Sequence, residues 1–578
     1  MQLFNDALDD TPADAGSLGF TGMDATTKPD QLPPDLLRDG RNLWMDGSGI
    51  VQTRPGLRLN AFLDPDAVLA VGDTRVQGAG YYDTPTTETL LAVRNGKLYA
   101  VDSSEASAAF THLAGPTPSA TAAVKFAQLV DRMFYSDGTL RWALDNAGWS
   151  FGTVSTFSTA AAMPTWATII AHNFRLLAVE AKGYKLYASA VASAHNPADW
   201  VPTENIRVGT GEGDPIKALI SSQGGNLIVL NLGSAWLVDT TAAALANWTV
   251  RKITDVAGCV EGKTAVALGQ DVFFLSRYGV VSLGALSDNI SLNPATTLSA
   301  PVQPYIDRIN WLAVDTAFAT VWQELYLLAV PLDEDTLPTV ILPFNVRTRR
   351  WMTPWTIGSQ GVLTGDASGA AVLIDEDDFF LVDETGAVLL DSGVVTPSLE
   401  ALEFTGLSAA ALTRFAGRQE TVIGDSVGRL LRIDPSAERD DTNPTSSQPV
   451  ESWATLKAHN FELPQNLKQP FTLDVQFERS TATGCQLNLV RDGQLAYPDI
   501  TLAASETIAA GLSTGNLTSF PVVFPLVFKP NTTYRRSFHL RDKPRFIECG
   551  LQVHSPRGRL RLRSARFSAF IDSAELLR

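Results

Sequence analysis

Short apolar runs separated by glycine- and asparagine-rich turns are the feature that most restricts the fold of this sequence. Residues 214–239, DPIKALISSQGGNLIVLNLGSAWLVD, contain three such runs, at 216–220, 227–230 and 235–238. The breaks between them are glycine-rich, and glycine and asparagine adopt positive φ at little steric cost. An antiparallel unit of three or four such strands is typical of one β-propeller blade or of part of a β-sandwich.

Similar units recur along much of the chain. Four segments place an apolar strand directly before an aspartate that can start a turn: LYAVD at 98–102, AWLVD at 235–239, FFLVD at 379–383 and LLRID at 430–434. Units spaced by roughly 35 to 50 residues are the size of propeller blades. The competing interpretation is a string of unrelated hairpins in two sandwiches, and helical patterns are weak nearly everywhere.

These patterns predict an all-β chain: a β-propeller of about six to eight blades with an added sandwich. Residues 1–40 are rich in Asp, Pro and Thr and are expected to form an extended N-terminal arm. Residues 41–435 are assigned to the propeller with insertions, and the polar, proline-containing residues 436–450 to a linker. Residues 451–578 contain longer alternating strands, which indicate an antiparallel β-sandwich with basic C-terminal strands.

The charge of the chain is negative overall and unevenly distributed. Its 578 residues carry a net charge of -17, which argues against a surface that grips nucleic acid by neutralising phosphates. Residues 531–578 are the exception, with ten Arg and one Lys against four carboxylates. An acidic body with a basic tail suggests a partner for the tail, and the alternative is a set of solvated arginines on strand faces.

Cysteine content and the N-terminus suggest a chain that folds in a reducing cytosol. Three cysteines are too few and too scattered for a disulfide framework or a metal cluster. The N-terminus, MQLFNDALDD, has neither the basic nor the apolar part of a secretion signal. No apolar run approaches the length of a membrane-spanning segment.

Motifs that would indicate catalysis or a cofactor are weak, so we expect a protein that is not an enzyme and holds no cofactor or metal. The segment GCVEGKT at 258–264 resembles the end of a phosphate-binding P-loop, but it is one residue short and continues as a strand. The six histidines show no metal-ligand or catalytic spacing. A turn of four carboxylates, Asp375, Glu376, Asp377 and Asp378, reads as a solvated loop, with a loosely bound cation as the lesser alternative.

Several segments in order along the chain resemble the tail-nozzle proteins of short-tailed bacteriophages, also called tail tubular protein B, tail hub or packaged-DNA stabilisation proteins. The resembling segments cover about two thirds of the chain. They are NLWMDGSGIVQTRPGL at 42–57, residues 172–189 with Asn196, Asp199 and Trp200, residues 213–238, residues 269–283, NVRTRRW at 345–351 and the basic C-terminal strands.

The resemblance implies a β-propeller with added β domains, assembled as a six-fold ring below the head-to-tail adaptor in the virion tail. Such a ring prolongs the channel through which genomic DNA leaves the capsid and helps to retain the packaged DNA. The implied partners are other copies of the chain, the adaptor, tail fibre or spike proteins, and DNA that passes without specific binding. Assembly would take place in the host cytoplasm.

The charge distribution suggests how these roles are divided. Carboxylates repel phosphates, so we expect an acidic lumen lined by loops such as Asp375, Glu376, Asp377 and Asp378. The arginine-rich strands are expected to face a neighbouring subunit or the adaptor. The candidate interface residues are Arg535, Arg536, Arg557, Arg559, Arg561 and Arg563.

Two other classes of function stay open at this point. One is a receptor-binding or carbohydrate-binding propeller at the tail tip, which exposed Trp and Tyr side chains gathered in one pocket would favour. The other is a bacterial surface or periplasmic propeller, which the missing secretion signal disfavours.

Overall fold

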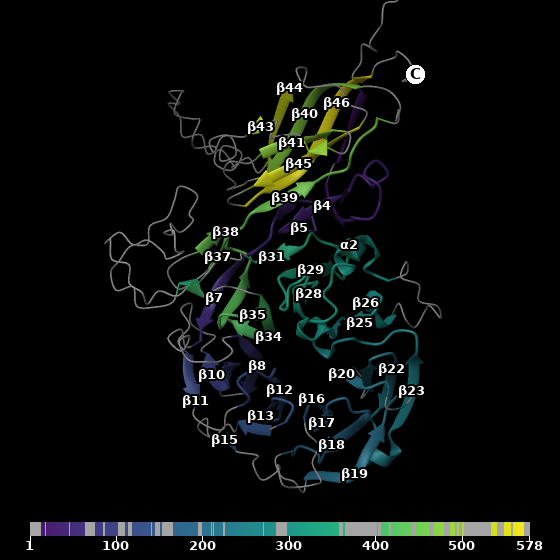
Figure 1. The fold of residues 1–578 in the computed structure, drawn as a ribbon, viewed down its shortest axis with the longest axis vertical. Coiled ribbons are helices and arrows are strands. Elements are labelled where there is room, and N and C mark those ends of the chain that lie inside the picture. The colour runs from purple at the N-terminus through teal and green to yellow at the C-terminus, as the bar shows by residue number, and fades with distance from the viewer. Residues whose placement is uncertain are drawn as a thin grey trace, which may run out of the picture.

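The structure is a computed structural model in which two β-rich parts are joined end to end (Figure 1). Its regular structure is almost entirely β-strand. The residues it describes are 13–17, 19–45, 47–63, 75–84, 87–101, 110–113, 118–139, 141–144, 151–152, 166–194, 199–209, 211, 213–222, 226–269, 271–284, 297–357, 362–363, 401–402, 406–415, 418–441, 447–461, 468–478, 486–491, 494–495, 500–501, 533–539, 548–555 and 559–571.

The first part is a ring of small antiparallel sheets, and its first four blades have four strands each. Blade 1 consists of β8 (Val76–Thr84), β9 (Thr87–Arg94), β10 (Lys97–Val101) and β11 (Phe110–Leu113). Blade 2 consists of β12 (Lys125–Leu129), β13 (Arg132–Ser136), β14 (Arg141–Leu144) and β15 (Phe151–Gly152). Blade 3 consists of β16 (Thr168–His172), β17 (Arg175–Val179), β18 (Lys185–Ser189) and β19 (Trp200–Arg207). Blade 4 consists of β20 (Ile216–Ser221), β21 (Asn226–Asn231), β22 (Ala235–Asp239) and β23 (Thr249–Thr254).

The remaining three blades are less regular. Blade 5 has β24 (Val266–Leu268), β25 (Asp271–Ser276) and β26 (Gly279–Ser282). Blade 6 has β27 (Phe318–Trp322), β28 (Leu325–Val330), β29 (Val340–Asn345), β30 (Arg350–Trp351) and β31 (Trp355–Thr356), and is extended by β2 (Gly22–Met23) and β3 (Leu36–Leu37). Blade 7 has β34 (Leu407–Phe415), β35 (Arg418–Asp425), β36 (Arg429–Asp434) and β7 (Gly56–Phe62).

The innermost strands of these blades touch one another in order around the ring. β8 contacts β12, β12 contacts β16, and β16 contacts β20. The one-turn helix η6 (Gly262–Thr264) contacts both β20 and β27, β27 contacts β34, and β34 contacts β8. This closed order makes the described residues a seven-bladed β-propeller, which confirms the expectation of a propeller (Figure 1).

The ring is closed by strands from distant parts of the sequence. In blade 7 the outermost strand, β7, pairs antiparallel with β36, so that Leu57 lies opposite Ile433. Since β7 precedes the first blade and β36 ends the last, the two ends of the propeller are joined by backbone hydrogen bonds.

Neighbouring inner strands approach more closely than side chains allow at some positions. Gly78 of β8 lies against the backbone of Val124, where an added Cβ would be 2.1 Å from the carbonyl oxygen. The amide of Val124 donates to the carbonyl of Gln77 at 2.9 Å, which links blades 1 and 2 at this point. Glycine is therefore required for the close approach of the two blades.

The second part is a sandwich of two six-stranded sheets. One sheet contains β44 (Thr533–His539), β40 (Lys468–Glu478), β46 (Arg561–Ile571), β6 (Val51–Thr53), β5 (Leu43–Met45) and β1 (Ala13–Ser17). The other contains β4 (Asp39–Arg41), β39 (Ser452–Thr455), β45 (Cys549–Ser555), β41 (Gln486–Arg491), β42 (Gln494–Leu495) and β43 (Ile500–Thr501). The alternation expected from the sequence is present: Leu473, Val475 and Phe477 of β40 are buried, and Asp474 and Gln476 between them are more exposed.

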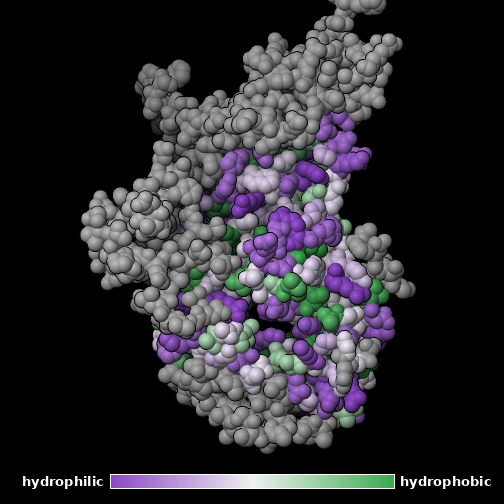
Figure 2. Space-filling view, viewed as in Figure 1, coloured by the Kyte–Doolittle hydropathy of each residue, from purple (hydrophilic) through white to green (hydrophobic). Residues whose placement is uncertain are grey.

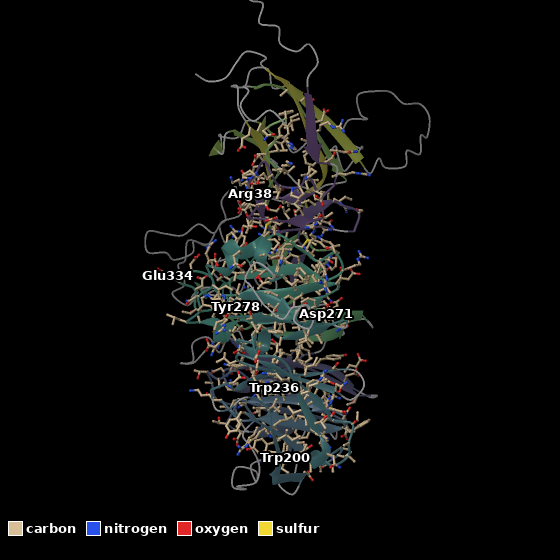
Figure 3. All side chains as sticks on the ribbon, turned by 90° about the vertical axis from the view of Figure 1, so that its right-hand side faces the viewer. Arg38, Trp200, Trp236, Asp271, Tyr278 and Glu334 are labelled. Atoms are coloured by element: carbon tan, nitrogen blue, oxygen red, sulfur yellow. The ribbon has the colours of Figure 1, made fainter. Side chains whose placement is uncertain are left out.

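The N-terminal segment is woven into both parts. β1 pairs with β46 and β4 pairs with β39, whereas β2 and β3 extend the sheet of blade 6. Arg38, labelled in Figure 3 near the junction of the two parts, donates from Nη1 to the carbonyl of Ala25 at 2.8 Å. The sequence set residues 1–40 apart as an arm, and their described strands are instead members of these sheets. The described part of the expected linker, 436–450, includes the short hairpin of β37 (Arg439–Asp441) and β38 (Ser447–Pro449).

One hydrophobic core crosses the junction between propeller and sandwich. Its buried side chains come from blades 5, 6 and 7 and from both sheets of the sandwich. Phe273, Leu328 and Leu431 represent the blades, and Val475 and Leu551 represent the two sheets. Because the two parts share this core, the chain forms one continuous block.

A buried polar cluster fixes the same junction. Arg54, between β6 of the sandwich and β7 of the propeller, is 2% exposed and forms a bidentate ion pair with Asp440, with Nη1 to Oδ1 at 2.9 Å. Its Nε donates to Asn42 Oδ1 at 3.1 Å, and Asn42 Oδ1 also accepts from the amide of Thr356 at 2.7 Å. Asp440 also accepts from the amide of Leu57 at 2.9 Å, so the pair reaches the first residues of the closing strand.

Replacing Gly78 by alanine tests the close approach of blades 1 and 2. We expect Gly78→Ala to lower the free energy of unfolding by about 1–3 kcal/mol, because the new Cβ displaces the backbone at Val124. The matched control is Gly213→Ala, since an added Cβ there meets nothing within 4 Å. Urea denaturation followed by tryptophan fluorescence measures both, and equal effects would contradict the explanation.

Removing the guanidinium of Arg54 tests the junction. We expect Arg54→Ala to cost about 3–5 kcal/mol of unfolding free energy, because Asp440 is left charged and buried. The control is Arg58→Ala, whose side chain is 54% exposed and pairs with Asp434 at 2.9 Å, so that about 0–1 kcal/mol is expected. A loss at Arg54 no larger than that at Arg58 would show that the junction does not depend on the buried pair.

Candidate functional site

The structure leaves the candidate channel-lining residues undescribed. Asp375, Glu376, Asp377 and Asp378 all lie outside the described residues, which end at 363 before this segment and resume at 401. Their role in an acidic lumen stays a prediction.

The candidate interface arginines are distributed over the sandwich. Arg535 and Arg536 lie on β44, which forms one edge of its sheet and pairs with β40. Arg557 lies outside the described residues. Arg563 is exposed on β46, and Arg561 on the same strand is half-buried.

Arg559 is used within the chain. Its Nη2 donates to the carbonyls of Pro435 at 2.6 Å and Ala437 at 2.9 Å, which ties the start of β46 to the end of blade 7. Burial lowers the pKa of this guanidinium from its usual value. This residue therefore connects the sandwich to the propeller.

One face of β46 packs against a buried histidine. The ring of His459 lies 6.0 Å from that of Phe567, and His459 exchanges backbone hydrogen bonds with Cys549 at the start of β45. Removal from water, with a smaller effect from the charge of Lys457, lowers the pKa of His459 from the ordinary 6.5 to about 4. This histidine is neutral in the folded protein at neutral pH.

The most distinctive site lies at the centre of the propeller. All seven blades contribute to a cavity of about 270 Å³, and Figure 2 shows an opening near the middle of this part of the molecule. The lining residues lie at the start of the innermost strand of each blade or just before it. They are Gln77–Ala79, Ala123–Phe126, Thr168, Ile169, Lys217–Leu219, Gly262, Lys263, Ala265, Phe318, Ala319 and Ser408–Ala410.

Three lysines from three blades share this cavity. Lys125 of blade 2 donates from Nζ to the hydroxyl of Thr168 in blade 3 at 3.1 Å. Lys217 is on β20 and Lys263 is on η6. Within the described part of the chain, the ammonium groups of Lys217 and Lys263 form no ion pair with a carboxylate. The cavity wall therefore carries positive charge that no direct contact neutralises.

The environment of the cavity disfavours this charge. Burial lowers the pKa of Lys125; the carboxylate of Glu261 opposes this effect, and the charges of Lys263 and Lys217 add to it. Burial likewise lowers the pKa of Lys263, with Glu261 and Asp315 opposing. The shifts show that the ammonium groups lie close enough to repel one another in a space with limited water.

The segment that resembled a P-loop supplies one side of this cavity. Glu261 accepts a hydrogen bond from the amide of Lys263 at 3.2 Å and so begins the single turn of η6, which leads into β24. Cys259, just before it, is fully buried, and burial raises the pKa of its thiol to about 12. A single 3-10 turn followed by a strand lacks the helix that a P-loop requires.

Sequence reasoning missed the lysine cavity. Lys125, Lys217 and Lys263 are separated by long stretches of sequence, and each is an ordinary polar residue in its own segment. The available signal was positional: Lys125 and Lys217 lie at the start of the first strand of a blade, and Lys263 lies in the turn just before such a strand. The degeneracy of the repeat hides this equivalence.

The described residues contain neither a metal-binding cluster nor a membrane-spanning helix. No group of three or more His, Cys, Asp or Glu side chains there is arranged to hold a metal ion. No helix there is both long enough and apolar enough to cross a membrane.

Comparison with known proteins finds similarity in structure alone. No protein-family model matches the sequence, and no curated protein matches it. Similar solved structures include Sqt1 of Saccharomyces cerevisiae, at 12% identity and a TM-score of 0.36, over 66% of this chain and all of that one. YCF48 bound to D1 peptide has 10% identity and a TM-score of 0.32, over 66% of this chain and 99% of that one. PorZ, a surface component of the type-IX secretion system of Porphyromonas gingivalis, has 11% identity and a TM-score of 0.35, over 70% of this chain and 42% of PorZ.

The lowered pKa of His459 predicts a specific sensitivity to acid. The unfolded chain takes up the proton near pH 6.5 and the folded chain only near pH 4, so protonation favours unfolding between these values. The stability contributed by the neutral ring is complete above pH 6.5, and about 3 kcal/mol is lost as the pH falls to 4.

We expect His459→Phe, which does not titrate, to lose this part of the pH dependence. The measurement is the unfolding free energy of both proteins at intervals from pH 7.5 to 4, and the difference between the two curves isolates this histidine. Parallel curves would contradict the assignment.

Proposed function

We propose that this chain is a structural subunit of a bacteriophage tail, which forms a ring below the head-to-tail adaptor, extends the DNA exit channel and helps to retain packaged DNA. The ring is a homohexamer in the virion, assembled in the host cytoplasm. The proposal rests on the resemblance of several segments to tail-nozzle proteins, and on what these segments do in this chain.

Two of the resembling segments contribute to the junction between the propeller and the sandwich or to the core that the two parts share. Residues 42–57 contain β5, β6 and both Asn42 and Arg54 of the buried junction cluster. Residues 345–351 include Trp351, whose indole donates to the carbonyl of Leu298 at 2.6 Å in the shared core. These two segments therefore help to fix the position of the sandwich relative to the propeller.

The observation that best supports a wall-forming role is the rigid connection of the two parts. A subunit that lines a conduit needs a fixed shape, because every subunit of a closed ring repeats the same interface. The shared hydrophobic core and the Arg54–Asp440 pair supply this fixed shape. The side view in Figure 3 shows the resulting elongated block, with Trp200 near the end of the propeller farthest from the sandwich.

The charge distribution fits passage of DNA without tight binding. A net charge of -17 disfavours the release of counterions from phosphates that holds proteins on DNA. The exposed arginines of β46, Arg563 and Arg566, lie on the sandwich, where we assign them to contacts with a neighbouring subunit, the adaptor, or a tail fibre or spike.

The test is the assembly state of the purified full-length chain. We expect a closed ring with the mass of six 62.2-kDa chains, about 370 kDa, in mass photometry and a six-fold view in negative-stain electron microscopy. In the same preparation, gel shift at physiological salt should show no retention of duplex DNA.

The variant Arg566→Glu should weaken the ring while leaving thermal unfolding unchanged, if this exposed arginine faces a neighbouring copy. A chain that stays monomeric alone and with the adaptor, and that binds sugars on a glycan array, would instead favour a carbohydrate-binding propeller at the tail tip. Clamping of duplex DNA by single chains would also contradict the proposal.

A further inference from the structure

The central cavity of the propeller carries an excess of positive charge. Its three lysines come from blades 2, 4 and 5, so that they face the cavity from different directions. Further charges act on these lysines without joining the lining. They are Glu261, Asp315 and Arg75. Among the described residues, the lining itself contains three lysines and no carboxylate.

Glu261 is itself engaged elsewhere, because its carboxylate accepts the amide of Lys263 at the start of η6. One carboxylate cannot balance three lysines, and no Asp or Glu is among the described residues of the lining. The group that would complete the balance is absent from the described residues of the cavity lining.

We propose that this cavity is a binding site for a small phosphate-bearing anion, held by the ammonium groups of Lys125, Lys217 and Lys263. The geometry carries the proposal: lysines from three separate blades line one cavity at the centre of the propeller, and its described lining contains no carboxylate. Lysine ammonium groups donate three hydrogen bonds each and pair readily with phosphate oxygens.

A structural role alone does not account for these lysines. Charged groups that lose water without a partner cost free energy, and apolar side chains would fill the same space without this cost. Lys125 has one neutral partner, Thr168, and its pKa is lowered by burial and by the other two lysines. An arrangement that is unfavourable when empty and favourable when an anion enters is typical of a binding site.

The size of the cavity limits the ligand. Its volume of about 270 Å³ is slightly below the range of pockets that enclose drug-sized molecules. Phosphate or diphosphate therefore suits the cavity better than a whole nucleotide, and duplex DNA has no access to a space walled by the inner strands of the blades. The proposal is thus independent of the tail ring and of any contact with DNA.

The experiment is a calorimetric titration of the full-length protein with sodium pyrophosphate at constant ionic strength. We expect saturable binding at one site per chain and a rise in the unfolding temperature with ligand concentration. Inorganic phosphate and ADP are separate arms. Tighter binding of pyrophosphate than of ADP supports a free anion, and tighter binding of ADP would show that the site takes the phosphate end of a nucleotide.

Two lysine variants and a matched control locate the site. Lys217→Met and Lys263→Met should each weaken pyrophosphate binding about tenfold or more, since each removes a charge-assisted hydrogen bond. Lys252→Met is the control, because Lys252 pairs with Asp255 at 2.6 Å on the exposed strand β23 and should leave the affinity unchanged.

The unfolding temperature of the ligand-free variants separates binding from structure. We expect Lys217→Met and Lys263→Met to be at least as stable as the unaltered chain without ligand, because each relieves repulsion inside the cavity. Lys217→Arg, which keeps the charge, should retain more affinity than Lys217→Met and serves if a methionine variant fails to fold.

Three results would overturn the proposal. One is the absence of saturable heat and of any stabilisation at millimolar pyrophosphate. Another is full binding by Lys217→Met and Lys263→Met, with loss of binding in Arg563→Gln and Arg566→Gln, which would place the anion on the sandwich. The third is a loss of ligand-free stability in both methionine variants with unchanged affinity, which would make the lysines structural.

Discussion

Closure of the propeller by β7 is the constraint on which the rest of the structure depends. This strand completes blade 7, yet it directly follows β6 of the sandwich, with only Arg54 and Pro55 between them. The chain therefore cannot close the ring without also placing the sandwich against it. Arg54 lies at this point, and its pair with Asp440 holds the closing strand from the side of β37. Pairing of β7 with β36 therefore closes the ring and at the same time fixes the position of the sandwich.

Local chemistry in the sequence predicted the kind of structure well. The turn at Asn95 and Gly96 has positive φ at both residues, as a two-residue hairpin requires. The repeated closing segments at 98–102, 235–239 and 430–434 correspond to β10, β22 and β36, each the third strand of its blade. The pairing of β7 with β36 was not predictable in the same way. It joins residues far apart in sequence, and nothing in either strand specifies a distant partner.

The N-terminal segment and the lysine cavity escaped prediction for a related reason. β2 and β3 are two residues long, and no periodicity can be read from two residues, although Met23 and Leu37 are buried in the shared core. The cavity depends on which residues lie at the start of each blade, and the blades differ too much in sequence for these positions to be recognised as equivalent. Both features depend on the closed ring, which brings together residues that are far apart in the sequence.

Two groups of basic side chains in this acidic chain lie in different settings. On β46, Arg563 and Arg566 are exposed and alternate with buried side chains such as Leu562 and Ala565, so they lie on a surface that another protein could contact. In the propeller, Lys217 and Lys263 line the central cavity of about 270 Å³, which suits a small anion. A passing polyanion such as DNA would be held by the first group if it faced the lumen and would be unaffected by the second. In the proposed ring the sandwich arginines therefore belong at protein interfaces, while the cavity lysines are compatible with any orientation of the propeller.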